Sequence, residues 1–350
     1  MGKSSTFNDQ SNPIIQTVEL GPQWPTIDPF LFCAHHDDAY PAGDESMAPA
    51  APLTGRQIGS DFSGRDGWSM YHGDAVPGFP QHPHRGFETV TYVRSGLIDH
   101  SDSMGAAARF GRGDVQWMTA GKGVVHSEMF PLVNADAPNP TELFQIWVNL
   151  PAADKMVDPY FTMQWDENVP RVTTTDADGR SAVVTVIAGT YADAVPAPPP
   201  PNSWAARDEA DFAIWHITLD DGASLTLPGA LGQQTVRTLY VFEGDGVEIA
   251  HSTVGGSTGV LVEADVDLTL RATNGPVEIL VLQGRPIGEP VARYGPFVMN
   301  TQQQIEEAFA DYQRTQFGGW PWPENAPAHP RDAERFARHS DGRVEAPTRR

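Results

Sequence analysis

Cysteine, lysine and long apolar runs are scarce in this chain of 350 residues. Cys33 is the only cysteine, which excludes an internal disulfide framework and favours a reducing, cytoplasmic setting. No run of about 18 apolar residues occurs, so a membrane-spanning helix is not expected. Residues 1–13 lack the apolar core of a secretory signal. We therefore expect a cytoplasmic protein that makes no membrane contact.

Lysine is found only at positions 3, 122 and 155, whereas Asp and Glu together number 45 and the formal net charge is −22. A surface of this charge repels phosphate backbones, so direct binding of nucleic acid is not expected. Adaptation to a salty cytosol and an arginine-for-lysine bias from base composition both explain this balance. The sequence does not separate these two explanations.

Glycine and proline are abundant, with 33 and 31 residues, and they separate short β-type segments along most of the chain. Strands this short at this spacing are typical of a β-sandwich or barrel. The clearest predicted strands are residues 88–93, 115–118, 142–148, 182–187, 212–219, 238–242, 260–263 and 277–282.

One α-helix is predicted near the C-terminus. Thr301 can cap its start, and Gly318 and Gly319 are expected to end it. The apolar side chains between these points fall on one helical face: Ile305, Phe309 and Tyr312.

A faint internal repeat divides the strand-rich part of the chain. Residues 91–96 resemble residues 238–244, with Tyr92 aligned on Tyr240. The repeat predicts two barrels of similar size in tandem, with the join near residues 151–159.

The residues best suited to chemistry lie in GFPQHPHRGFETVTYVRSG (78–96) and GDVQWMTAGKGVVHSEMF (113–130). Side chains alternate between the two faces of a strand, so His82 and His84 share a face, as do His126 and Glu128. Two neighbouring antiparallel strands can therefore bring these four groups to one point inside a barrel. The same two-residue spacing occurs twice, which separates this set from the histidines elsewhere in the chain.

The other histidines are interpreted as ordinary polar residues. His35 and His36, which two aspartates follow, are expected in an exposed loop. The remaining ones stand singly: His72, His100, His216 and His251.

Three imidazoles and one carboxylate would form a mixed nitrogen and oxygen site. Four protein ligands already fill a tetrahedral Zn²⁺ site, whereas six-coordinate iron would keep about two positions for water, O₂ or substrate oxygens. Iron, as Fe(II) or Fe(III), is therefore the favoured metal. Mn, Ni, Co, Cu and Zn remain open, because the donor set alone does not fix the metal.

Three strings point to a family: HPHRGFETVTYV, GDVQWMTAGKGVVHSEMF and EPVARYGPFVMNTQQQIEEAFADYQ. Together they closely resemble the pirin family of the cupin superfamily, over residues 26–318. The resemblance implies an all-β fold of two tandem cupin barrels (double-stranded β-helix, jelly-roll) packed face to face, with a C-terminal helix. It also implies iron in the first barrel, with the family's ligands falling on His82, His84, His126 and Glu128.

The predicted boundaries follow from this resemblance. They are an N-terminal arm (1–25), an N-terminal metal-binding cupin domain (26–155), a C-terminal cupin domain without metal (156–300), and a C-terminal helix and tail (301–350). With Tyr92 set on Tyr240, the four ligand positions fall on residues that form no ligand set: Ala230, Gly232, Asn274 and Pro276.

Two alternatives accompany the resemblance. The general cupin pattern would take its carboxylate from Glu88, for which a hydrogen bond to a ligand imidazole or a backbone N–H is the other role considered. Residues 34–69 and 191–211 fit the family less well, and they are expected to be solvated loops or else a lid or oligomer contact.

The implied function is an oxidoreductase of the quercetin 2,3-dioxygenase type, which opens a flavonol ring with O₂. Glu128 is a candidate base for the substrate hydroxyl. The resemblance equally allows a metal- or redox-dependent regulatory protein, such as a transcription cofactor or a modulator of a metabolic enzyme, with a protein partner. A third hypothesis is a metal-binding barrel whose substrate is unrelated to flavonols.

Overall fold

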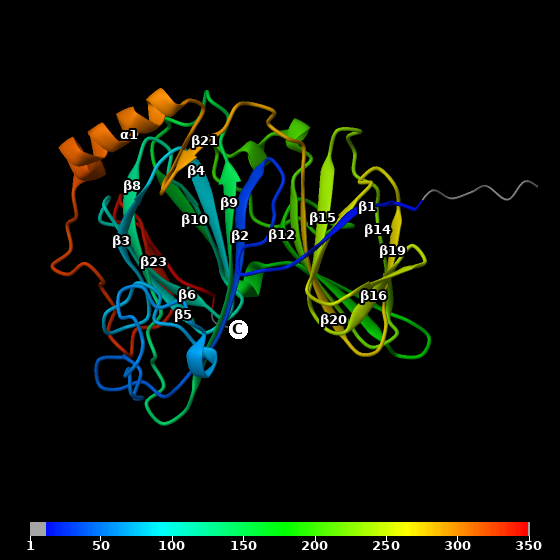
Figure 1. The fold of residues 1–350 in the computed structure, drawn as a ribbon, viewed down its shortest axis with the longest axis horizontal. Coiled ribbons are helices and arrows are strands. Elements are labelled where there is room, and N and C mark those ends of the chain that lie inside the picture. Colours follow the sequence, from blue (N-terminus) through cyan, green and yellow to red (C-terminus); the bar gives the residue numbers. More distant parts are fainter. Residues whose placement is uncertain (1–11, 349–350) are drawn as a thin grey trace, which may run out of the picture. The chain divides into compact units, whose positions relative to one another are not determined.

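The structure is a computed structural model, and it describes residues 12–348. The chain folds into two compact β units (Figure 1). The N-terminal unit comprises Pro22–Pro170, Val195–Ala210 and the described residues from Pro286 onward. The C-terminal unit comprises the described residues before Pro22, Arg171–Ala194 and Asp211–Arg285.

The N-terminal unit contains two main antiparallel sheets. Its strands are β2 (Phe30–Tyr40), β3 (Gly78–His84), β4 (Phe87–Ser95), β5 (Leu97–Asp102), β6 (Ala107–Gly111), β7 (Val115–Thr119), β8 (Val124–Met129), β9 (Asn139–Asn149), β10 (Tyr160–Gln164), β21 (Ala292–Tyr294), β22 (Phe297–Met299), β23 (Phe336–Arg338) and β24 (Val344–Glu345). One sheet has the order β10-β7-β4-β9-β2, and the other has the order β24-β23-β6-β5-β8-β3. Strands β21 and β22 form a separate hairpin.

The C-terminal unit repeats this plan with a larger and a smaller sheet. Its strands are β1 (Ile14–Glu19), β11 (Arg171–Thr175), β12 (Ser181–Ala188), β13 (Ala213–Leu219), β14 (Ser224–Leu227), β15 (Val236–Glu243), β16 (Gly246–Ile249), β17 (Ser252–Gly255), β18 (Thr258–Val262), β19 (Leu268–Ala272) and β20 (Val277–Gly284). The larger sheet has the order β1-β18-β15-β20-β13-β12-β11, and the smaller has the order β14-β19-β16-β17.

The internal repeat corresponds to equivalent strands of the two units. Strand β4 pairs with β7 and β9, and β15 pairs in the same way with β18 and β20. All eight predicted strand segments overlap observed strands. The predicted all-β class with tandem barrels is therefore confirmed.

Each unit builds its own core from alternating apolar residues. In β20, the side chains of Val277, Ile279 and Val281 enter the core of the C-terminal unit. In the N-terminal unit, Val93 of β4 and Leu143 of β9 enter a separate core. Full burial of one such side chain stabilises the fold by about 1.5–3 kcal/mol.

The predicted helix is present as α1 (Gln302–Thr315). Thr301 caps it: its hydroxyl accepts from the backbone N–H of Gln304, whose side chain accepts from the Thr301 N–H in return. The helix ends at Thr315, where Gln316 adopts a left-handed backbone at φ 46°, before the predicted glycine stop. Figure 1 shows α1 beside β21 at one end of the barrel.

Short 3₁₀ helices occupy some of the connections. They are η1 (Arg65–Gly67), η2 (Asp166–Asn168), η3 (Trp204–Ala206), η4 (Asp208–Ala210) and η5 (Gln316–Gly318).

The structural units divide the chain differently from the predicted boundaries. Strand β10 lies after the predicted join at 155/156, but it pairs with β7 of the N-terminal unit. Strand β1 lies in the predicted N-terminal arm, yet it pairs with β18 of the C-terminal unit. Residues 1–11 of that arm lie outside the described residues. The units differ from the predicted boundaries because β1 and β10 each pair with an edge of a large sheet, and that pairing decides which unit the strand belongs to.

The C-terminal tail is part of the N-terminal unit. Strand β23 pairs with β6, and the buried Arg109 of β6 donates to the carbonyl oxygens of His329, Pro330 and Ala333. The same guanidinium makes two hydrogen bonds of 2.7 Å to Asp99. The tail is therefore held by a buried, charge-assisted anchor.

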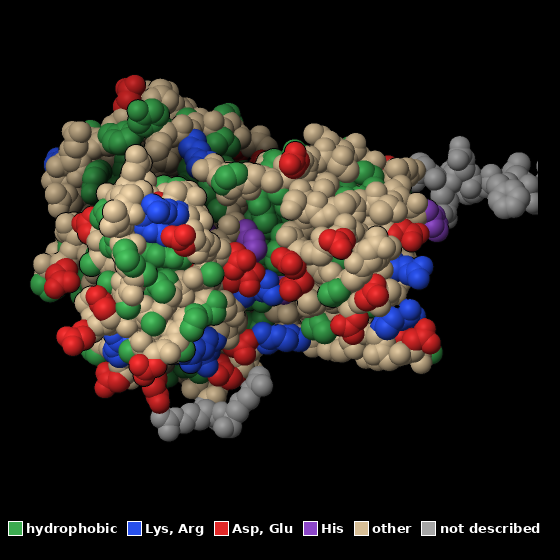
Figure 2. Space-filling model, turned by 60° about the horizontal axis from the view of Figure 1, so that its bottom comes forward, with side chains coloured by type: hydrophobic (Ala, Val, Ile, Leu, Met, Phe, Trp, Pro, Cys, Tyr) green, Lys and Arg blue, Asp and Glu red, His purple; other side chains and the backbone are tan. Residues whose placement is uncertain are grey.

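Acidic side chains are spread over the face drawn in Figure 2, with Lys and Arg side chains between them. Among residues 12–348, no helix has the length and apolar character that crossing a membrane requires.

Candidate metal centre

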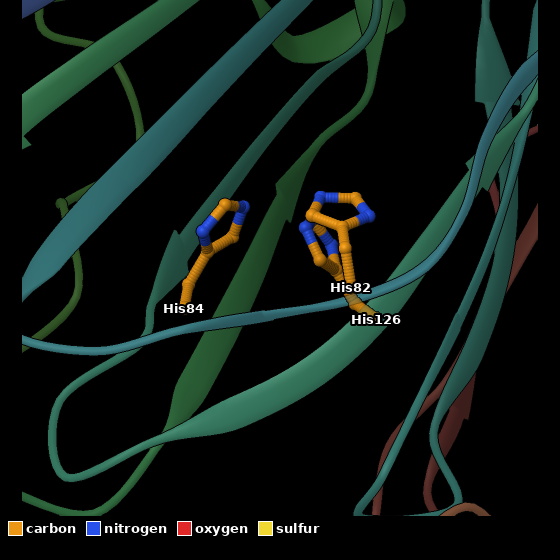
Figure 3. A group of neighbouring side chains, drawn as sticks. All are labelled: His82, His84 and His126. Atoms are coloured by element: carbon orange, nitrogen blue, oxygen red, sulfur yellow. The ribbon is translucent and has the colours of Figure 1, made fainter. Parts of the chain in front are cut away.

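Neighbouring strands bring the predicted histidines together. Strands β3 and β8 are paired, and His82 stands directly opposite His126. One ligand nitrogen from each of His82, His84 and His126 lies within 4.8 Å of the others. Figure 3 shows the rings of His82 and His126 next to each other, with the ring of His84 turned toward them.

A glycine turn fixes the end of β3. Gly86 lies between β3 and β4 at φ 85°, and a Cβ atom on it would approach the carbonyl oxygen of Val298 to 2.0 Å. Only glycine fits this backbone, because a side chain would be both strained and in collision. The turn places His84 at the strand end, beside the rest of the cluster.

The imidazoles of His84 and His126 are buried, and that of His82 is half-buried. Loss of contact with water sets their protonation. It lowers the pKa of His82 to about 4, with smaller contributions from neighbouring histidines. Burial and the adjacent imidazoles hold the pKa values of His84 and His126 well below the usual value. All three rings are therefore neutral at pH 7, which is the form that binds a metal.

Hydrogen bonds orient two of the rings. Nδ1 of His82 donates to the carbonyl oxygen of Pro80 at 2.8 Å, which leaves Nε2 with a free lone pair. Nδ1 of His84 lies 3.4 Å from the carbonyl oxygen of Pro296. Each ring therefore keeps one nitrogen available to a ligand.

His126 provides the strongest sign that a metal fits. Both of its ring nitrogens are buried and have no hydrogen-bond partner within residues 12–348. An unsatisfied polar atom in the interior costs about 1–3 kcal/mol. Coordination of a metal by one of these nitrogens would remove part of that cost, so the donor set present fits a metal ion.

Glu128 lies beside the histidine cluster. Its Oε2 is 3.9 Å from Nε2 of His126, but the set of atoms within 4.8 Å of one another does not extend to it. Gln145 donates to one carboxylate oxygen at 3.3 Å. The Thr91 hydroxyl lies 3.2 Å from the other, but its shorter hydrogen bond, of 2.7 Å, is to the side-chain oxygen of Gln145. Burial raises the pKa of this carboxyl group. The predicted roles of Glu128 as ligand and base stay predictions.

Glu88 occupies the opposite face of β4. Thr91 lines the cavity beside the cluster, and strand alternation turns Glu88, three residues earlier, away from it. The Glu88 carboxylate is fully buried and accepts hydrogen bonds from Thr119 and Ser203. Ser203 belongs to the predicted loop 191–211. The fallback role of Glu88 as a ligand does not agree with this geometry.

Two histidines interpreted as ordinary polar residues lie near the site. His36 belongs to β2 and lines the cavity, so the prediction of an exposed loop was wrong. His100 of β5 is fully buried and stands opposite Glu128, with its ring centroid 5.5 Å from that of His126. The sequence carried a signal for His36: it lies two residues from Asp38 on one strand, so the two side chains share a face.

The cluster borders a cavity of about 700 Å³. Its wall includes His82, His84 and Glu128 together with aromatic side chains. These aromatic residues are Phe32, Phe62, Tyr71, Phe79, Phe130 and Trp147. The predicted extra segment 34–69 supplies Phe62 and other residues of the wall, so part of it belongs to the site and is not merely a solvated loop.

In the C-terminal unit, the residues that align with the four predicted ligands do not form a set of metal-binding side chains. They are Ala230, Gly232, Asn274 and Pro276. Among the described residues, the histidines His82, His84 and His126 form the one group of three or more potential ligand side chains that meets the 4.8 Å criterion. This group belongs to the N-terminal unit.

Comparisons with known proteins agree with this architecture. The family model Pirin matches residues 13–148, and that of the Pirin C-terminal cupin domain matches residues 214–318. A Pseudomonas aeruginosa protein provisionally named quercetin 2,3-dioxygenase is 37% identical over 243 residues, which is 69% of this chain and 79% of that protein. A pirin-like protein of Caulobacter vibrioides is 37% identical over 244 residues, or 70% and 82% of the two chains.

A solved structure gives the same fold. The crystal structure of a quercetin 2,3-dioxygenase from Acinetobacter baumannii matches with a TM-score of 0.68 and 28% identity, covering 87% of this chain and 98% of that one. The two β units and these matches define a protein with two cupin domains. The chain belongs to the pirin family.

Proposed function

We propose that this protein is a metal-dependent dioxygenase that opens the ring of a flavonol with O₂. Iron is the proposed metal, with His82, His84, His126 and Glu128 as its ligands. The observation that carries the proposal is the cluster of neutral histidines on the wall of an aromatic cavity of about 700 Å³. The quercetin 2,3-dioxygenase names of the similar proteins support the choice of substrate class.

The cavity suits a flat aromatic molecule. Phe32 and Trp147 lie on its wall with ring centroids 5.1 Å apart, and the guanidinium of Arg293 lies 4.7 Å above the Trp147 ring. Such surfaces stack on aromatic rings and exclude water from them. The side chains therefore favour a planar, electron-rich substrate.

The proposed reaction divides its roles between the metal and the chain. A bound metal ion would acidify a coordinated substrate hydroxyl and assemble the substrate with O₂. Glu128 is the proposed acceptor of the hydroxyl proton. Gln145 donates to one of its oxygens, and Thr91 orients Gln145 through a hydrogen bond of 2.7 Å. O₂ is the oxidant: both of its atoms enter the organic product, and one ring carbon leaves as carbon monoxide.

The test begins with metal content. Purified protein is stripped, reloaded separately with Fe(II), Mn, Ni, Co, Cu or Zn, and analysed for bound metal and for quercetin consumption under air. His82→Ala is expected to lose stoichiometric metal. His216→Ala, which removes a buried histidine of the C-terminal unit, is the matched control and is expected to retain it.

Two results would overturn parts of this proposal. Stoichiometric metal in His82→Ala would refute the ligand assignment. A metal-loaded wild-type protein that leaves flavonols unchanged under air would refute the enzyme assignment, and a metal-dependent regulatory role would then be the function to pursue.

A further inference from the structure

A hydrogen-bonded chain of three side chains lies on the cavity wall, apart from the proposed ligands. Nδ1 of His36 is 2.8 Å from the hydroxyl oxygen of Tyr71, and this hydroxyl donates to Oδ2 of Asp38 at 2.7 Å. The other Asp38 oxygen accepts from the backbone N–H of Ser69 at 2.9 Å. All three side chains line the same cavity as His82 and His84.

The hydrogen bonds between these three side chains determine which atom carries each proton. A tyrosine hydroxyl has one hydrogen, and Tyr71 gives it to Asp38, so its oxygen accepts from N–H at Nδ1 of His36. Burial lowers the pKa of His36 to about 4, so the ring is neutral at pH 7 and carries its one proton on Nδ1. Nε2 is then an acceptor, and it has no hydrogen-bond partner among residues 12–348.

The backbone holds Tyr71 in place for this role. Tyr71 adopts φ 55°, a left-handed conformation that bulky residues seldom occupy. Two backbone hydrogen bonds of 2.8 Å with Asp61 maintain it. Its ring also stacks on Phe79, with centroids 5.2 Å apart. Strain of this kind persists where the surrounding structure imposes it, and it concentrates at functional sites.

The acceptor lies one aromatic ring away from the histidine cluster. The centroid of Phe79 is 6.1 Å from that of His36 and 6.3 Å from that of His82. A flat molecule that reaches the cluster at one end can therefore lie along Phe79 and present its other end to His36.

We infer that Nε2 of His36 forms a second polar subsite, which accepts a hydrogen bond from a hydroxyl group at the end of an aromatic substrate remote from the metal. Tyr71 and Asp38 are positioning residues, because they act through His36 by fixing its tautomer. The ligand class is a planar polyphenol that has hydroxyl groups at both ends. The placement of a metal at the other end of the substrate and the choice of flavonols as probes rest on the proposed function.

The test compares two flavonols that differ at the remote end. Quercetin has hydroxyl groups on its pendant ring, and the control flavonol has the same fused rings with an unsubstituted pendant ring. Dissociation constants are measured without O₂ on the metal-loaded protein, so that no turnover is required. Wild-type protein is expected to bind quercetin about tenfold more tightly, the size of one good hydrogen bond.

The variants assign this preference to the subsite. His36→Phe keeps an aromatic ring without the acceptor and is expected to remove the tenfold preference, leaving the affinity for the control flavonol within about twofold. Tyr71→Phe frees the His36 tautomer and is expected to reduce the preference about threefold. His72→Phe is the control for replacing a histidine of the cavity wall by phenylalanine: the His72 imidazole lines the same cavity but is exposed to solvent, so the tenfold preference is expected to persist.

Several outcomes would overturn the inference. They are equal binding of both flavonols by the wild type, binding of neither, or an unchanged ratio in His36→Phe. If His36→Phe fails to fold, His36→Leu, which also lacks the acceptor, is measured in its place, and an unchanged ratio in that variant overturns the inference. A protein that shows the preference but consumes no flavonol under air would refute the proposed function alone, and turnover with an unchanged ratio would refute the subsite alone.

Discussion

Glu88 is the position where a general cupin pattern and this structure disagree most directly. We predict that Glu88→Gln retains stoichiometric metal, because its carboxylate lies on the opposite face of β4 from the cavity. We also predict that the substitution alters how stability depends on pH. The second effect follows from the burial of this carboxyl group.

The magnitude comes from the pKa of Glu88. Burial raises it from 4.5 to about 7, and hydrogen bonds from Ser203 and Thr119 oppose part of that rise. Between these two pH values the folded protein keeps a proton that the unfolded chain has released, so raising the pH favours unfolding. The contribution of this carboxyl group to the free energy of unfolding is complete below pH 4.5 and is lost as the pH rises through about 7. At about 1.4 kcal/mol per tenfold change in ionisation, the loss is roughly 3 kcal/mol.

The assay is urea unfolding at pH 5 and pH 8, followed by tryptophan fluorescence. Other titrating groups contribute equally to both proteins, so the difference between wild type and Glu88→Gln isolates this carboxyl group. The wild type is expected to lose roughly 2–3 kcal/mol more than the variant between the two pH values. Glu45→Gln, at an exposed position of the same unit, is the control and should behave as wild type. Equal pH dependence in all three proteins would refute the reasoning, and loss of metal from Glu88→Gln would refute the face assignment.

Three further predictions concern residues that support the site. Gln145→Leu removes a donor to Glu128 and is expected to weaken metal affinity about 10- to 100-fold. The affinity is measured by competition with a chelator, and an unchanged affinity would count against Glu128 as a ligand. Arg109→Met leaves Asp99 buried without its cationic partner, so it should cost about 3–5 kcal/mol in urea unfolding, with part of the loss recovered when Asp99 is also replaced by Leu. Lys155→Met deprives three buried acceptors, including the oxygens of Gly86 and Asn149, of their donor and should cost about 2 kcal/mol in the same assay.

The strands and the histidine cluster can be predicted from the sequence because both depend on the local alternation of side chains. His82 and His84 share a face of β3 whatever the rest of the chain does, and His126 follows the same rule on β8. The pairing that sets His82 opposite His126 requires only that two strands be neighbours. The helix was equally predictable, since Thr301 and its apolar face are local signals.

The unit boundaries and the cavity wall could not be obtained in this way. Strand β1 pairs with β18, and β10 joins the sheet of β7, so pairings between distant segments decide which unit each strand completes. Tyr71 reaches Asp38 across 33 positions of sequence, through a segment without long regular elements. No periodicity reports such a contact, because the backbone there follows individual hydrogen bonds and not a repeating pattern.

This contrast separates two kinds of specificity within the site. The proposed ligands lie on β3 and β8, where strand geometry fixes them, while His36, Tyr71 and Phe62 come from β2 and the irregular segment that follows it. Loops on a rigid scaffold can change their side chains without disturbing the strands beneath them. Substitutions in residues 34–71 should therefore change which molecule is bound and leave metal content intact, whereas substitutions at the three histidines should abolish both. If variants of the irregular segment lose metal in proportion to ligand binding, this separation is wrong and the wall and the metal centre fold as one unit.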